Sequence, residues 1–320
     1  MPDGLGGVLS AWAEDDPPRA QRAEATLRGL LATRGQGVGV WDGSALTLPG
    51  CPWELAFSSG DPAWRYTVEP GPPQAPEARL DLAVDLLGGL GARRPEEALL
   101  QTLRSLQKGR PLRQGAHISV RHGPEGDRFK LYVELPELSW RVAETTLAPW
   151  LRAPLSWHGE ARNLRAALVG LGPGCQQIEL YGGVDRLYGA ELATLMAPSG
   201  LERRAPAVLA LVRSCLTWPD GSLLPGPHWG FSHGLSPNGA PTFTVYTMAR
   251  TLFGPDGASR EALLGLTRRL GLDLGHYARL SAPLVGRRGF MGCHGMFGVV
   301  VANDAPLNIW IGLAPPGCAR

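Results

Sequence analysis

Two short segments on either side of residue 60 carry side chains whose types and spacing suit chemistry. Apolar and polar residues alternate in 51–58 (CPWELAFS) and in 64–70 (WRYTVEP), so each segment predicts a strand with one apolar and one polar face. The turn 59–62 (SGDP) joins the two strands into a hairpin. Glu54 and Arg65 then project from one sheet. A carboxylate and a guanidinium placed in this way can hold two different chemical groups at a fixed separation.

A second motif suggests a different chemistry. The segment 230–234 (GFSHG) matches the GxSxG pattern of serine hydrolases, and Asp273 with His276 or His294 would formally complete a triad with Ser232. That pattern requires a strand, a sharp turn and a helix, whereas here a Pro-Asn-Gly turn and another alternating segment follow. A serine hydrolase is therefore the less favoured alternative.

The bulk composition excludes several classes of function. A formal net charge of +2 over 320 residues argues against a nucleic-acid surface dominated by phosphate contacts, and no apolar run approaches the length of a transmembrane helix. The five cysteines show no CxxC spacing, and the N-terminus has no basic segment leading an apolar one. We therefore expect no zinc ribbon, disulfide framework or signal peptide, and a cytoplasmic protein without nucleic-acid or membrane partners.

Hairpin patterns recur along the chain, and helical patterns fill the intervals. The unit of helices and one β-hairpin repeats about five times at a spacing of about 50–70 residues, which suggests a closed, quasi-symmetric architecture. Further pairs of alternating segments, joined by turns, lie at 117–121/129–134, 167–171/177–181, 229–233/242–246 and 296–301/307–311. Helical patterns cover 18–33, 76–90, 95–108, 140–150, 184–196, 205–216 and 259–270.

The second strand of each hairpin has one apolar face and one polar, partly aromatic face. We expect the helices to cover the apolar face, and ten antiparallel strands to close into a barrel wide enough to leave a chamber. An open sheet whose polar face meets water is the alternative, and the aromatic rings on that face argue against it. The polar faces consist of Arg65, Thr67 and Glu69; Lys130, Tyr132 and Glu134; Gln177, Glu179 and Tyr181; Thr242, Thr244 and Tyr246; and Asn308 and Trp310.

These segments resemble the aromatic prenyltransferases of the ABBA or PT-barrel superfamily, and most of all the dimethylallyltryptophan synthase group. That group has a Pro-x-Glu-(Leu/Phe) strand, an Arg-(Phe/Tyr)-x-x-Glu-Pro strand and a Lys-x-Tyr strand, which this chain matches at 52–55, 65–70 and 130–132. In length the chain is more similar to the bacterial, peptide-modifying cyanobactin-type branch than to the fungal indole enzymes. The resemblance implies an α+β fold: a single PT-barrel domain over residues 1–320, in which five α-β-β-α repeats close a ten-stranded antiparallel β-barrel with helices outside.

The resemblance also implies roles for individual residues. Glu54 would accept a hydrogen bond from the indole N–H or phenol O–H of the acceptor and orient its ring. Arg65 and Lys130, one of only two lysines, would bind the diphosphate of an isoprenyl donor. Aromatic rings would stabilise the allylic cation that forms when diphosphate leaves, and would exclude water. This wall would consist of Tyr132, Tyr181, Tyr246 and Trp310.

The third and fourth returning strands depart from the indole enzymes. Those enzymes have further cations on the third strand, where this chain has Gln177 and Glu179, and the fourth strand has Thr244. Fewer cations would neutralise the leaving group less well. Three residues on outgoing strands could compensate: Arg121, as a further diphosphate ligand, and His117 and His233, as polar groups in the lumen.

The sequence therefore predicts an aromatic prenyltransferase. It would move an isoprenyl group, dimethylallyl in the simplest case, from its diphosphate to an electron-rich aromatic ring of Trp or Tyr, in a small molecule or a peptide. The resemblance implies an isoprenyl diphosphate as co-substrate and no requirement for magnesium, because many relatives of this group need no metal and this chain has no Asp-rich motif. A barrel that binds an aromatic or peptide ligand without catalysis is a further alternative.

Overall fold

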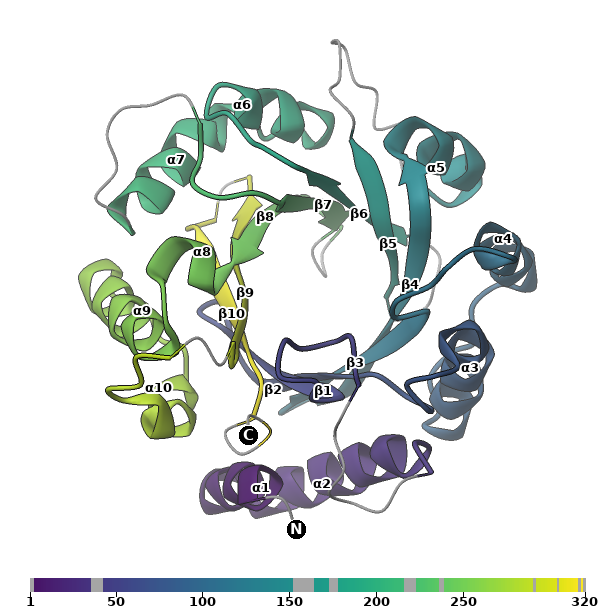
Figure 1. Ribbon diagram of the computed structural model, residues 1–320, viewed down its shortest axis with the longest axis horizontal. Coiled ribbons are helices and arrows are strands. Elements are labelled where there is room, and N and C mark those ends of the chain that lie inside the picture. The colour runs from purple at the N-terminus through teal and green to yellow at the C-terminus, as the bar shows by residue number, and fades with distance from the viewer. Residues whose placement is uncertain are drawn as a thin grey trace.

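Ten antiparallel strands of the computed structural model close into a barrel in the order β1-β10-β9-β8-β7-β6-β5-β4-β3-β2. Figure 1 looks down this barrel. The structure describes residues 3–35, 43–151, 164–172, 178–215, 223–235, 239–289, 292–303, 305–315 and 318. The strands are β1 (Trp53–Ser58), β2 (Asp61–Val68), β3 (Ala116–Gly123), β4 (Gly126–Ser139), β5 (Arg165–Leu171), β6 (Ile178–Val184), β7 (Trp229–Leu235), β8 (Pro241–Met248), β9 (His294–Ala302) and β10 (Asn308–Leu313).

The helices surround the barrel on its outside (Figure 1). Those expected from the sequence occur, some of them shorter, and α1, α8 and α10 are additional. None within the described part of the chain has the length and apolarity to cross a membrane. The helices are α1 (Asp3–Asp15), α2 (Pro17–Ala32), α3 (Arg79–Gly89), α4 (Glu97–Gln107), α5 (Trp140–Leu147), α6 (Glu191–Met196), α7 (Ala205–Ser214), α8 (Ala249–Phe253), α9 (Asp256–Leu270) and α10 (Tyr277–Leu280).

The two faces of the barrel wall differ in burial. Residues that point toward the helices, such as Val120 and Leu131, are at most 1% exposed. Their neighbours in sequence point inward and are only half-buried, for example the side chain of Lys130, which is 26% exposed. Because the strands form a closed barrel, this exposure means that solvent reaches its interior. The closed barrel shows that the open-sheet alternative is wrong, and the polar residues line its inner face.

The alternation predicted that Glu69 shares the lumen face with Arg65, but Glu69 does not. It follows the last residue of β2 and is 1% exposed. Its carboxylate pairs with the buried guanidinium of Arg79 at the start of α3, and Arg34 donates to its backbone oxygen at 3.1 Å. Ser44 donates to the same carboxylate. The Glu-Pro end of the motif thus ties three segments together at one end of the barrel.

One disulfide is present, although the sequence predicted no disulfide framework. Cys51 and Cys318 are bonded, with their Cα atoms 5.7 Å apart. The bridge joins the residue two positions before β1 to the segment that follows β10. The spacing of the cysteines could not reveal this pairing, because closure of the barrel is what brings β1 and β10 together.

Candidate active site

Glu54 lies on the inner face of β1 and leans over two glycines of neighbouring strands. A Cβ atom added to Gly312 on β10 would lie 2.6 Å from the Glu54 carboxyl carbon, and one added to Gly295 on β9 would lie 3.0 Å from it. The side chain is half-buried, and the partial removal of its carboxyl group from water raises the pKa of Glu54 to about 8. No other described residue bonds to its carboxyl group, which is therefore available to a ligand.

The four aromatic residues predicted to form a wall lie in one arc inside the barrel. The ring centroids of Tyr132 and Tyr181 are 5.5 Å apart, those of Tyr181 and Tyr246 are 6.5 Å apart, and those of Tyr246 and Trp310 are 6.2 Å apart. The four rings come from β4, β6, β8 and β10, the second strand of four successive hairpins. An arc of ring faces is an environment in which a carbocation can be stabilised.

Glycines on adjacent strands let these rings lie against the wall. A Cβ atom on Gly298 would overlap the indole of Trp310, and one on Gly230 would overlap the ring of Tyr246. Gly170 stands in the same relation to Lys130. Glycine inside a strand is costly unless something approaches the backbone closely. These strand glycines are a sequence signal for bulky inward side chains on the adjacent strands, although the prediction of the lumen residues did not rest on them.

Lys130 forms an ion pair inside the barrel with Glu179. Its ammonium group also donates to the Tyr181 hydroxyl at 3.0 Å and lies 5.1 Å from the ring centroid of Tyr132. The second carboxylate oxygen of Glu179 accepts from Ser232 at 2.6 Å. Burial alone would raise the pKa of Glu179, but the charge of Lys130 and these hydrogen bonds hold it below its ordinary value.

Arg65 and Arg121, both predicted to bind diphosphate, meet at the carboxylate of Asp61. Arg121 donates to its two oxygens at 2.6 and 3.0 Å, and Arg65 also pairs with it. Burial would raise the pKa of Asp61, yet the two guanidinium groups hold it well below its usual range. Asp61, expected in a turn between two strands, is the first residue of β2.

The remaining predicted residues separate into inner and outer positions. His117 stacks on Tyr132 with centroids 4.8 Å apart, and burial lowers its pKa to about 3. Thr244 also points inward, opposite Ser232 in the register of β7 and β8. Gln177 lies outside the described residues.

His233 is not a lumen residue, and this prediction was wrong. Its ring lies on the outer face of β7, 5% exposed, 2.8 Å from the Ser199 hydroxyl and packed against Trp140 and Phe243. The reason is the alternation of β7: Ser232 points inward, so its neighbour must point outward.

No hydrolase triad forms around Ser232. Its hydroxyl donates to Glu179 inside the barrel, in the middle of a strand rather than at a strand-to-helix turn. His276 instead bonds to Trp64 and Asp15 outside the barrel. His294 is buried between Asp256 and Tyr277. The GxSxG match is therefore incidental.

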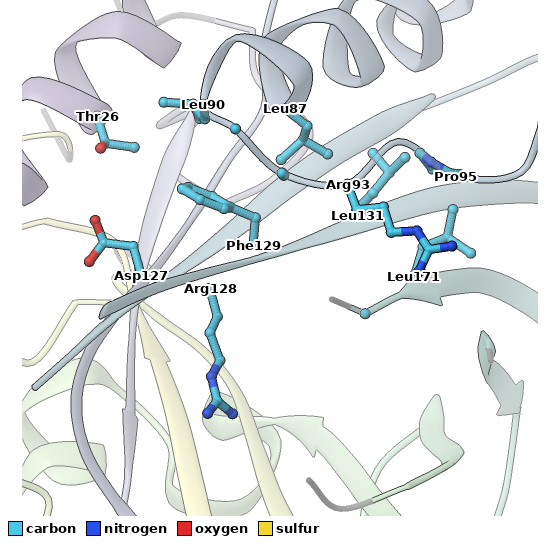
Figure 2. Close-up of a pocket in the computed structure, with 13 residues that line it drawn as sticks. Thr26, Leu87, Leu90, Arg93, Pro95, Asp127, Arg128, Phe129, Leu131 and Leu171 are labelled. Carbon is cyan, nitrogen blue, oxygen red and sulfur yellow. The ribbon is translucent and has the colours of Figure 1, made fainter. Parts of the chain in front are cut away.

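Figure 2 shows a pocket of about 460 Å³ that lies on the outside of the barrel wall. Leu87 of α3, Leu90 just after that helix and Phe129 of β4 line it. Arg128 points to the opposite side of β4 from Phe129 (Figure 2), which is the side on which Lys130 also lies. Among the described residues, no three His, Cys, Asp or Glu side chains gather as a metal site would require.

No protein-family model matches the sequence, and no curated protein matches it. Solved structures do match. The 5-dimethylallyltryptophan synthase from Streptomyces coelicolor has a TM-score of 0.77 and 18% identity, covering 100% of this chain and 98% of that one. The prenyltransferase PriB, in a ternary complex with L-tryptophan and dimethylallyl thiolodiphosphate, has a TM-score of 0.74 and 16% identity, covering 100% and 97%.

A third match is the 6-dimethylallyltryptophan synthase from Micromonospora olivasterospora, in complex with DMASPP and Trp. It has a TM-score of 0.69 and 16% identity, covering 99% of this chain and 98% of that one. At these identities the similarity shows a shared fold. The expected PT-barrel architecture, ten antiparallel strands with helices outside, is therefore confirmed.

Proposed function

We propose that this protein is an aromatic prenyltransferase that transfers an isoprenyl group, dimethylallyl in the simplest case, from its diphosphate to an electron-rich ring. The observation that carries the proposal is the combination, in one barrel, of the Glu54 carboxyl group, to which no described residue bonds, an arc of four aromatic rings, and several cations. The fold it shares with PriB and the two dimethylallyltryptophan synthases supports the same reaction class.

Glu54 is proposed to orient the acceptor. Its carboxyl oxygen accepts a hydrogen bond from an indole N–H or a phenol O–H, and the carboxylate formed above pH 8 accepts it more strongly. PriB and the 6-dimethylallyltryptophan synthase from Micromonospora olivasterospora both have structures in complex with tryptophan, which favours an indole. The peptide acceptor suggested by the length of the chain is a finer proposal, and offering free amino acids and peptides side by side tests it.

The reaction then proceeds by electrophilic substitution. The carbon–oxygen bond of the donor breaks, the electron pair leaves with diphosphate, and cationic side chains neutralise it. The allylic cation is stabilised by the faces of Tyr132, Tyr181, Tyr246 and Trp310 until a ring carbon bonds to it. Loss of the ring proton to a base restores aromaticity. The products are the prenylated ring, diphosphate and one proton.

The test is incubation of the purified chain with dimethylallyl diphosphate and tryptophan, tyrosine or peptides containing them, with magnesium and with EDTA in separate arms. We expect a product heavier by one C5H8 unit, with release of diphosphate, detected by mass spectrometry. Ligand binding without any such product would instead support the non-catalytic barrel, which the pairing of Lys130 with Glu179 favours.

A further inference from the structure

The charge inside the barrel is distributed unevenly. Lys130 and Glu179 neutralise each other, and both are held by neighbours, Lys130 by Tyr181 and Glu179 by Ser232. Their side chains are 26% and 20% exposed, so solvent screens this pair less than a surface pair. A diphosphate that enters this region meets no net positive charge unless it breaks the pair.

A second group of charges lies on β2, β3 and β4, and its member on β4, Arg128, lies two positions before Lys130. Arg65 of β2, Arg121 of β3 and Arg128 of β4 are successive register partners, so we call them the arginine row. One carboxylate, that of Asp61, pairs with the first two. Arg128 lies 3.8 Å from Glu125, whose side chain is 86% exposed, and an ion pair of this kind contributes little. Three cations and the carboxylate of Asp61, which is 12% exposed, leave the row with a net charge of about +2.

We propose that the donor diphosphate binds to the arginine row, that Arg128 is one of its ligands, and that Lys130 stays paired with Glu179. The identification of the bound anion as the donor diphosphate rests on the proposed function. Planar guanidinium groups suit phosphate oxygens, and Asp61 holds two of the three in fixed positions.

The arginine row also lies at a suitable distance from Glu54, the residue proposed to orient the acceptor. Thr67 is the register partner of Glu54, and Arg65 is two residues from Thr67 on β2. Two residues of a strand span about 7 Å. A five-carbon chain that leaves a diphosphate at the row therefore extends toward the ring that Glu54 would hold.

Binding of inorganic diphosphate tests this proposal without turnover. Titration calorimetry at constant ionic strength would compare the wild type with Arg128→Gln, with the double variant Lys130→Met/Glu179→Gln, and with Arg141→Gln, an exposed arginine of α5. The double variant removes the internal pair as a unit and leaves no unpaired charge. We expect Arg128→Gln to raise Kd at least tenfold, the double variant to change it less than threefold, and Arg141→Gln less than twofold.

Three results would overturn the proposal: no binding by the wild type, an unchanged Kd in Arg128→Gln, or a tenfold loss in the double variant, which would place the diphosphate at Lys130. These outcomes differ from failure of the proposed function. If diphosphate binds to the arginine row but no prenyl transfer occurs, the row is an anion-binding site and only the proposed catalysis is contradicted.

Discussion

The carboxyl group of Glu54 occupies the space that a side chain on Gly312 would need. The carboxyl carbon lies 2.6 Å from the position of a Cβ atom there, although the two residues belong to different strands. The side chain of Glu54, which is proposed to orient the acceptor, therefore fits in its place because Gly312 of β10 has no side chain. Since Gly312 does not have a positive φ, its backbone would tolerate alanine, and the three atoms nearest to an added Cβ all belong to Glu54.

Gly312→Ala is expected to displace Glu54 while leaving the barrel folded. A misplaced orienting group costs about 10- to 100-fold in rate, so product formation should fall by that factor while the melting temperature changes little. Initial rates of prenylation and a thermal unfolding curve measure both effects. Gly88→Ala is the control, because a Cβ atom at that exposed site of α3 meets nothing within 4 Å. Full activity in Gly312→Ala would show that the position of Glu54 does not matter.

The raised pKa of Glu54 makes stability depend on pH in a defined direction. Its pKa rises from 4.5 to about 8 through burial, so the folded protein holds the proton more tightly than the unfolded chain. The contribution is complete below pH 4.5 and is lost as the pH rises through about 8. Because solvent reaches the side chain, we expect a loss of about 2 kcal/mol rather than the full value of the shift.

Urea unfolding at about pH 5, 7 and 9 would measure this loss as the difference between the wild type and Glu54→Gln, which cannot titrate. The free energy of unfolding of the wild type should decrease relative to the variant as the pH rises. A difference that stays constant over this range would mean that Glu54 is solvated like a surface carboxylate.

Lys130 and Glu179 should be energetically coupled. Lys130→Met alone leaves the carboxylate of Glu179 without its cation inside the barrel, whereas the double variant with Glu179→Gln leaves no charge. A double-mutant cycle in urea is expected to give a coupling energy of about 2 kcal/mol. The control is the helix pair Arg28 and Glu24, with side chains 35% and 41% exposed. Its coupling should be about 0.5 kcal/mol or less, and equal values for the two cycles would contradict an internal pair.

Alternation along the strands was sufficient to predict the barrel and most of its inner face. Glu54, Tyr132, Tyr181, Tyr246 and Trp310 each lie one position from a buried apolar residue, so the period of two fixed their side. The prediction that His233 points into the lumen was wrong because its strand is buried on both faces. With no polar face to set the phase, the alternation of β7 carries no information about direction.

The pairing of charges could not be predicted, because it depends on register between strands far apart in sequence. Lys130 and Glu179 are 49 residues apart, and Arg121 and Asp61 are 60 residues apart. Asp61 looked like a turn residue, and Arg128 looked like part of a hairpin end. The strand glycines at 170, 230, 298 and 312 were the available clue that bulky inward side chains lie beside them.

The most direct test of the account compares prenylation of tryptophan by the wild type, Glu54→Gln and Glu261→Gln at about pH 9, where the carboxylate form of Glu54 prevails. Glu261 is a solvent-facing acid on α9, 62% exposed, and serves as the matched control. We predict that Glu54→Gln loses about 100-fold in product formation while Glu261→Gln stays within twofold of the wild type. Wild-type turnover by Glu54→Gln would contradict the claim that this carboxyl group orients the acceptor.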